Sequence, residues 1–122
     1  MQPDIKIKRI YEEHLKTDGF RILVDRLWPR GFTKEKAAID EWAKDLAPST
    51  PLREWFHHND VKWTEFEKKY LAELKQNAAV EDFIEQHKDK KKITLVFAAK
   101  DLEHNHAIVL QQFLQQAIQA SH

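Results

Sequence analysis

Apolar residues recur along the chain with two different spacings, and these spacings predict a mixed α/β fold. Ile5, Ile7 and Ile10 alternate with Lys and Arg, which predicts a first strand with one solvent-exposed face. A Thr-Asp-Gly turn signal precedes a second predicted strand over 20–25, where three aliphatic residues run directly into charged ones. The continuous apolar run at 93–99 predicts a central strand that is covered on both faces.

Spacings of three and four residues between apolar side chains predict helices in the rest of the chain. The predicted helices lie at 34–38 after Thr33, from about 50 to 57 with Ser49 or Thr50 as the cap, between Asn59 or Asp60 and Asn77, around 80–87, and at 107–118. Residues 39–46 fit a helical face and one face of a strand, and Ala47-Pro48 ends either element.

The order of these elements favours the α/β class, with a small sheet of three or four largely parallel strands flanked by helices in a single compact domain over 1–122. The link at 11–19 is short for a parallel crossover. The first two strands are therefore expected to be antiparallel or joined by a compressed turn of helix.

The composition limits the cellular compartments and the types of chemical site that are expected. The 122 residues fit one domain, and the lack of cysteine excludes disulfides, thiolate metal sites and thiol nucleophiles. Lys plus Arg and Asp plus Glu balance at 20 each, so net charge does not draw the protein to nucleic acid or to an anionic membrane. Without a signal-peptide core or a run of membrane-spanning length, we expect a soluble, cytoplasmic protein with no membrane partner.

Two of the apolar strands end in polar clusters, and these clusters form the candidate site. If the strands at 20–25 and 93–99 are parallel neighbours, both clusters open at the same carboxyl edge of the sheet. There Asp25 and Asp101 are expected to orient groups or transfer protons, and His106 to act as a general acid or base. The simpler alternative is that Asp101 caps the last helix and Asp25 pairs with a neighbouring arginine.

The same region contains side chains suited to hold a small anionic or planar ligand. Arginine and lysine supply positive charge, an asparagine amide supplies hydrogen bonds, and a tryptophan ring can stack on a planar molecule. The predicted ligand-binding residues are Arg26, Trp28, Arg30, Lys44, Lys100 and Asn105. Backbone amides that open the last helix are expected to add donors for an anion.

No metal or cofactor is predicted. His57-His58 lies close to Asp60, and His104 is two residues from His106, but this spacing does not place two ligands on one helical face and no third ligand is obvious. With two glycines in the chain, neither a glycine-rich phosphate loop nor a dinucleotide fingerprint can form.

Four segments, in order, resemble a known family. DGFRILVDRLWPRGFTKEKA, DEWAKDLAPSTPLREWFHH, WTEFEKKYLAEL and ITLVFAAKDLEHNHAIVL are similar to the YeaO-like branch of the proteins grouped as domain of unknown function 488. The resemblance covers nearly the whole chain. It implies a small bacterial or archaeal α/β domain with a strand at 42–46, and it implies no established function.

One departure from the family pattern limits what the resemblance transfers. The wider group often carries a Cys-His-Arg triplet at the start of its last helix, where this chain has Asn105-His106-Ala107. Roles for a thiol or an arginine therefore do not transfer, and only His106 retains a role from the triplet.

Two functions follow as hypotheses. The first is a polar pocket at the carboxyl ends of 20–25 and 93–99 that binds an anionic or planar small molecule, with hydrolysis of that molecule as its enzymatic version. The second is a nucleic-acid-binding or regulatory interaction module that uses Arg26, Trp28 and Arg30 as a basic and aromatic surface.

Overall fold

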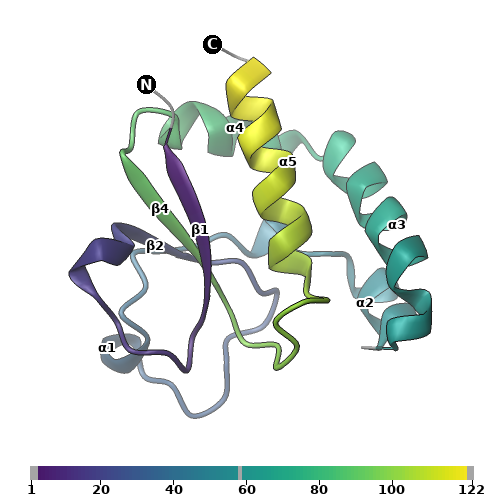
Figure 1. Ribbon diagram of the computed structural model, residues 1–122, viewed down its shortest axis with the longest axis horizontal. Coiled ribbons are helices and arrows are strands. Elements are labelled where there is room, and N and C mark those ends of the chain that lie inside the picture. The colour runs from purple at the N-terminus through teal and green to yellow at the C-terminus, as the bar shows by residue number, and fades with distance from the viewer. Residues whose placement is uncertain (1–2, 58, 121–122) are drawn as a thin grey trace.

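A four-stranded parallel sheet forms the centre of the protein (Figure 1). The computed structural model describes residues 3–57 and 59–120. In their spatial order, the strands are β1 Asp4–Arg9, β4 Lys92–Phe97, β2 Phe20–Leu23 and β3 Glu41–Trp42. Every pairing is parallel. The α/β class and the largely parallel sheet predicted from the sequence are confirmed.

Helices connect the strands. Thr33, Ser49 and Asn59 are caps that the sequence predicts, whereas Asn77, predicted as the end of a helix, also caps the next one. The α-helices are α1 Lys34–Ala37, α2 Thr50–Phe56, α3 Trp63–Lys75, α4 Ala78–His87 and α5 His106–Ala120, and the 3-10 turns are η1 Lys16–Asp18, η2 Lys44–Leu46 and η3 Asp60–Lys62. The side chains of Thr33, Ser49, Asn59 and Asn77 each accept a hydrogen bond from a backbone amide that follows them, which satisfies a donor at the start of the element. Within the described ranges, no helix is long and apolar enough to cross a membrane.

Side chains of the central strand β4 alternate between the two faces of the sheet. Ile93 and Leu95 belong to a large core to which α2, α3, α4 and α5 all contribute. Val96 belongs to a smaller cluster with Ile10 and Ala37 on the opposite face. In Figure 1, α5 runs beside β1, and it packs against β1, β4 and α3. The prediction that 93–99 contains a central strand covered on both faces is confirmed.

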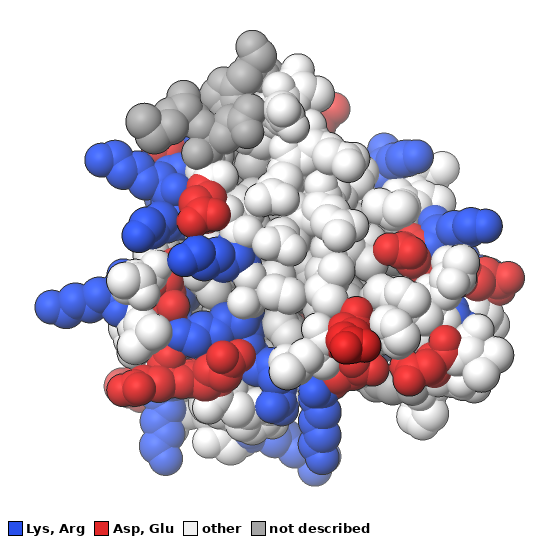
Figure 2. Space-filling view, in the orientation of Figure 1, with Lys and Arg blue, Asp and Glu red and all other residues white. Residues whose placement is uncertain are grey.

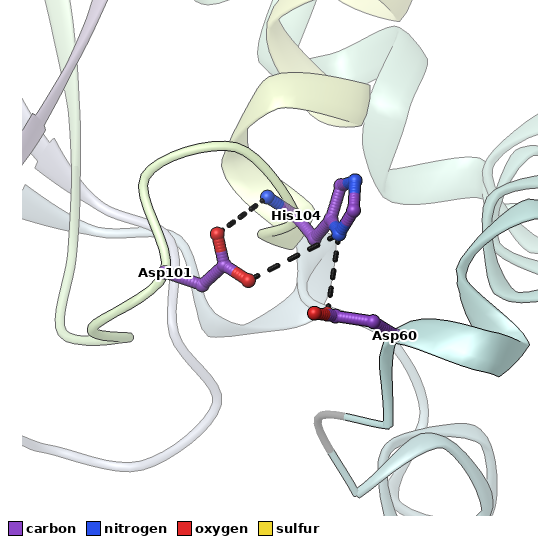
Figure 3. A group of neighbouring side chains, drawn as sticks. All are labelled: Asp60, Asp101 and His104. Atoms are coloured by element: carbon purple, nitrogen blue, oxygen red, sulfur yellow. Dashed lines mark hydrogen bonds and ion pairs between the residues drawn. The ribbon is translucent and has the colours of Figure 1, made fainter.

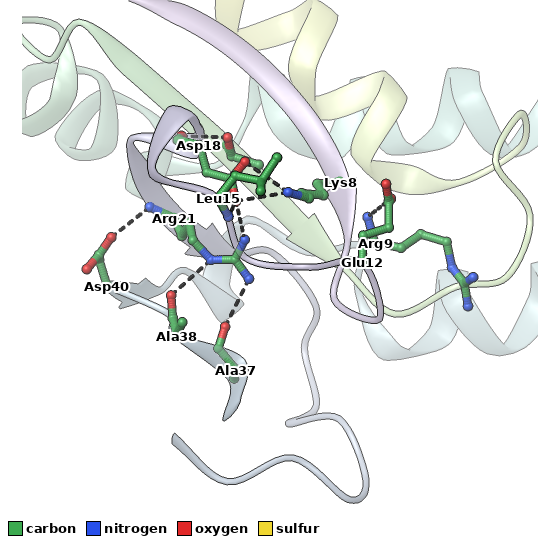
Figure 4. A network of polar contacts seen from close by, with 10 residues as sticks. Lys8, Arg9, Glu12, Leu15, Asp18, Arg21, Ala37, Ala38 and Asp40 are labelled. Atoms are coloured by element: carbon green, nitrogen blue, oxygen red, sulfur yellow. Dashed lines mark hydrogen bonds and ion pairs between the residues drawn. The ribbon is translucent and has the colours of Figure 1, made fainter. Parts of the chain in front are cut away.

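A buried ion pair occupies the face of the sheet opposite the long helices (Figure 4). Asp18 Oδ2 accepts from Arg21 Nη1 at 2.6 Å, and Lys8 Nζ lies 3.0 and 3.1 Å from the two carboxylate oxygens. Arg21 is 1% exposed and also donates to the carbonyls of Ala37 and Ala38, at 3.0 and 2.9 Å. These bonds hold η1 and the end of α1 against the sheet.

The segment after β3 differs from the prediction. The strand comprises Glu41–Trp42 alone, and Lys44–Leu46 form η2, so the strand implied over 42–46 is wrong for most of that range. The amide of Ala43 still donates to the carbonyl of Leu23, but the amide of Leu46 then donates back to Ala43. This local bond turns the chain away from β2, and it is not visible in the spacing of apolar residues.

The direction of the first two strands is now established. Both β1 and β2 pair in parallel with β4, which lies between them, so the antiparallel alternative is wrong. The short link contains η1, which is the compressed helical turn that the sequence offered as the other possibility.

One band of the surface has no charged side chains. The chain contains no Lys, Arg, Asp or Glu from His104 to Ala120. In Figure 2, the region of α5 is accordingly an uncharged band with charged residues on both sides. Exposed glutamines, among them Gln112, Gln115 and Gln116, provide the polar outer surface of this helix.

Asp18 should make stability fall in acid. Burial raises the pKa of its carboxyl, but hydrogen bonds from the Leu15 amide, Lys8 and Arg21 outweigh burial and lower the pKa below the ordinary 3.8. Such a group stabilises the fold above its unfolded pKa, and the contribution is lost as the pH falls through the folded pKa. We expect the free energy of unfolding to decrease below about pH 4.

The Asp18→Asn variant tests this assignment. It should lose about 3 kcal/mol at pH 7, because it leaves a buried guanidinium without its counter-charge, and it should show a weaker acid dependence than the wild type. Urea unfolding at pH 7 and pH 3 measures both effects. An unchanged acid dependence in the variant would contradict the role given to Asp18.

Gly19 and Gly31 form a matched pair for a second test. Gly19 has a φ of 68°, and a Cβ there would lie 2.6 Å from both the Cβ and the carbonyl oxygen of Lys92. Gly31 has a φ of 81° with nothing within 4 Å of such a Cβ. Gly31→Ala should cost about 1 kcal/mol from left-handed backbone alone, and Gly19→Ala about 2–4 kcal/mol because the clash adds to it. Equal losses in thermal unfolding would show that the contact with Lys92 relaxes freely.

Candidate functional site

A cleft of about 610 Å³ lies at the carboxyl edge of the sheet. Its ionisable and amide side chains are Asp25, Arg26, Arg53, Asp60, Lys100, Asp101, Asn105 and His106, and its apolar walls include Leu27, Trp28, Pro48, Phe56 and Phe66. Because β2 and β4 are parallel neighbours, the polar clusters that follow them meet at this edge. A space of this size and lining suits a small organic molecule.

Asp25 joins the ends of the two central strands. Its Oδ2 accepts from the amide of Ala98 at 3.0 Å, one step beyond the pairing of the Val24 amide with the Val96 carbonyl. Its Oδ1 is buried and accepts no hydrogen bond from the residues that the structure describes, although Nε2 of His106 lies 3.1 Å away. One carboxylate oxygen is therefore structural, and the other lies within ion-pair distance of His106 Nε2 but receives no hydrogen bond from the described residues.

His106 is the first residue of α5, and its Nε2 is occupied. That nitrogen donates to the carbonyl of Val24 at 3.1 Å, which explains why the nearby oxygen of Asp25 receives no bond. The imidazole side chain is 15% exposed, and its ring lies edge-on to the ring of Tyr70 with the centroids 6.3 Å apart. A ring nitrogen that donates to a carbonyl does not accept a proton, so Nε2 is not a base in this arrangement.

Asn105 and Asp101 shape the loop before α5. Asn105 is 1% exposed, and its Oδ1 accepts from the Ile108 amide at 3.1 Å while its Nδ2 donates to the Asp101 carbonyl at 2.9 Å. Asp101 Oδ1 accepts from the amides of Glu103 and His104. The cap of α5 is thus Asn105, and one of the backbone amides at the start of α5, that of Ile108, is already used.

The guanidinium of Arg26 holds one wall of the cleft in place. Its Nε donates to the carbonyl of Pro48 and its Nη2 to the carbonyl of Ala47, each at 3.1 Å. The residue predicted as a ligand anchor therefore ties the segment after β2 to the turn before α2. Two of its donor groups are not available to a ligand.

Two residues of α3 fix the same wall from behind. The buried hydroxyl of Tyr70 donates to the Leu46 carbonyl at 2.5 Å, and the carboxylate of Glu73 accepts from the amide and hydroxyl of Ser49. Burial, reinforced by the Glu73 carboxylate, raises the pKa of Tyr70 well above its usual value of 10. The Tyr70 hydroxyl therefore stays protonated and donates at any physiological pH.

Asp60, Asp101 and His104 converge beside the cleft (Figure 3). His104 Nδ1 lies 3.1 Å from Asp60 Oδ1 and 4.0 Å from Asp101 Oδ2, and its ring stacks on Trp63. One ligand atom from each residue falls within 4.8 Å of the others, and imidazole with carboxylates is a set of donor types found in divalent-cation sites. The sequence indicated no third ligand for His104 because Asp60 is distant from it along the chain. The other histidine pair considered for a metal, His57-His58, includes His58, which lies outside the described residues. The hydrogen bond between His104 and Asp60 accounts for this contact and ties η3 to the loop before α5.

Arg53 and Lys100 are the cations of the lining whose side chains form no hydrogen bond or ion pair with the described part of the chain. The three carboxylates of the lining are each engaged, Asp25 with the Ala98 amide, Asp60 with His104, and Asp101 with two amides. The cleft therefore combines balanced formal charge with two uncommitted positive groups.

The other predicted binding residues lie differently. Trp28 lines the cleft, but its Nε1 donates to the Phe32 carbonyl at 2.8 Å and its ring packs at 68° against Trp42. Lys44 lies over the Trp42 ring, 5.3 Å from the centroid, and Lys44 and Arg30 are exposed outside the lining. The structure thus brings seven of the nine predicted site residues to the cleft and leaves out Arg30 and Lys44.

Sequence reasoning missed the part of the cleft that the helices supply. Arg53 and Phe56 come from α2, Asp60 from η3, and Phe66 from α3. On short amphipathic helices such residues have the same pattern as an ordinary solvent-exposed or core-facing side chain. The available signal was the position of Arg53 in PLREW, which follows the family-like LAPS segment after one residue.

A family model described as "Inactive DUF488-N3 subclade" matches residues 4–122. The uncharacterised protein YeaO of Escherichia coli is 44% identical over 111 residues, which cover 91% of this chain and 96% of that protein. Uncharacterised proteins of Mycobacterium bovis and Mycobacterium tuberculosis are each 38% identical over 110 residues, 90% of this chain and 92% of theirs. No solved structure gives a significant match.

Arg26 and Arg30 offer a matched test of how the cleft wall is held. Arg26→Gln should lower the free energy of unfolding by about 2–3 kcal/mol, because it removes charge-assisted bonds to two carbonyls of the wall. Arg30→Gln removes the same charge at an exposed position and should change stability by less than about 0.5 kcal/mol. Urea unfolding distinguishes them, and similar values for the two variants would show that the bonds to Ala47 and Pro48 add little.

Proposed function

The chain belongs to the DUF488 family, within the subclade described as inactive, and from this premise we propose that its cleft binds a small organic anion without transforming it. The observation that supports the proposal is the pair of uncommitted cations, Arg53 and Lys100, on the lining of a cleft with apolar walls. A carboxylate or phosphate can receive bidentate hydrogen bonds from Arg53 and charge compensation from Lys100. The apolar walls would then bury the body of the ligand.

Several features favour binding over hydrolysis. The chain has no cysteine, and Asn105, which stands where the wider group often has one, is buried and used as the cap of α5. His106 uses Nε2 to donate to a backbone carbonyl. The side chains that the sequence suggested for proton transfer thus serve the architecture of the cleft, which suits a rigid receptor.

Charge-neutral variants of the two cations test the proposal. A thermal-shift screen of small carboxylates and phosphates should identify a compound that raises the melting temperature, because binding to the folded state alone stabilises it. Titration calorimetry with that compound should then show an affinity about ten-fold lower for Arg53→Gln and for Lys100→Gln, the usual effect of losing one charge-assisted bond.

Arg30→Gln and Lys44→Gln are the matched controls, because they remove the same charges outside the cleft. They should bind as the wild type does. A hit whose affinity falls equally in all four variants would contradict a site at this cleft. Absence of any anionic hit, together with salt-sensitive binding of generic RNA, would favour the nucleic-acid module instead.

A further inference from the structure

Asp25 contributes a feature of the cleft that an anion alone does not explain. Its Oδ1 is buried, it accepts no hydrogen bond from residues 3–57 and 59–120, and the residue lines the cleft. Nε2 of His106 lies 3.1 Å away, within ion-pair distance, but its hydrogen bond goes to the Val24 carbonyl. A buried carboxylate oxygen without a donor is costly, and a ligand that supplies a donor removes this cost.

The donor that fits best is a cation. The guanidinium of Arg26 directs Nε and Nη2 to the Pro48 and Ala47 carbonyls, and Asp25 Oδ2 receives one neutral amide bond from Ala98. A hydrogen bond between a carboxylate and an ammonium is shorter and stronger than one to a neutral donor. A primary ammonium also has three N–H donors, so it can bond to the carboxylate and to backbone carbonyls at the carboxyl edge of the sheet.

We infer that the ligand of this cleft is a small zwitterion of the amino-acid type, with its ammonium group on Asp25 and its carboxylate or phosphate on Arg53 and Lys100. This inference rests on the proposed function, since it adds a second charged group to the anion proposed there. The Phe56 and Phe66 rings, stacked with their centroids 4.3 Å apart, form part of the apolar wall beside these charges. An aromatic or aliphatic side chain suits that wall.

Three probes of one skeleton test the inference on the unmodified protein. L-phenylalanine has both charged groups, 3-phenylpropanoate has the carboxylate alone, and phenethylamine has the ammonium alone. Calorimetry should show L-phenylalanine binding about ten-fold or more tightly than either partial analogue, as expected when each charged group adds one charge-assisted bond. Equal or tighter binding of 3-phenylpropanoate would overturn the inference and leave the proposed function intact.

Asp25→Asn locates the ammonium. The variant keeps an acceptor for Ala98 but replaces the unpartnered oxygen by an amide donor, so it should lose the preference for L-phenylalanine while it binds 3-phenylpropanoate as before. A retained preference in a variant that unfolds as the wild type does would overturn the assignment to Asp25. If none of the probes or of a wider panel of amino acids binds while another anion does, the zwitterion fails alone. If Arg53→Gln also leaves that anion unaffected, the proposed function fails as well.

Discussion

The long helices cover one face of the small sheet. The buried contact between Asp18 and Arg21 allows the opposite face to be covered as well. On the opposite face, the guanidinium bonds to Asp18 and to two carbonyls near the end of α1, so a short irregular segment takes the place of a helical layer. An ion pair buried this deeply is costly to break, because either partner alone would be an uncompensated charge. Val96 and Leu23 of the sheet are fully buried.

Similar side chains in the cleft have different roles: some are bonded to its walls, and others remain available to a ligand. Arg26 and Arg53 both line it, yet the Arg26 guanidinium bonds to the carbonyls of Ala47 and Pro48, while the Arg53 side chain forms no hydrogen bond or ion pair with the described residues. Arg26 lies in LVDRLWPRG and its partners in LAPS, the two segments on which the resemblance to the family rests. The structure gives a physical reason for these segments to occur together, since one supplies the guanidinium that fixes the other.

Local signals in the sequence were sufficient for most of the helices and strands and for the sheet edge at which the cleft lies. Apolar runs, capping residues and the polar endings of two strands predicted the parallel sheet and its carboxyl edge, because each depends on nearby residues. The partners of individual side chains could not be predicted from the sequence. It did not show that Arg26 would bind the carbonyls at 47–48 or that Asp60 would reach His104. It also did not show that Asn105, and not Asp101, would cap α5. A charged residue has the same sequence pattern whether its side chain faces water, a ligand or a backbone carbonyl. The turn at η2 was missed because backbone bonds set it.

The position of β1 at the edge of the sheet has a consequence for the order of folding. Ile5 pairs with Ile93, so during synthesis β1 has no partner until β4 has been made. Contacts between segments so far apart form slowly, and an unpaired strand is prone to join another chain. Lys6, Lys8 and Arg9 give the waiting strand a repulsive charge, and Lys8 is neutralised by Asp18 when the strand docks. Lys8 therefore opposes association of the unpaired strand with another chain, and in the folded sheet it forms an ion pair with Asp18.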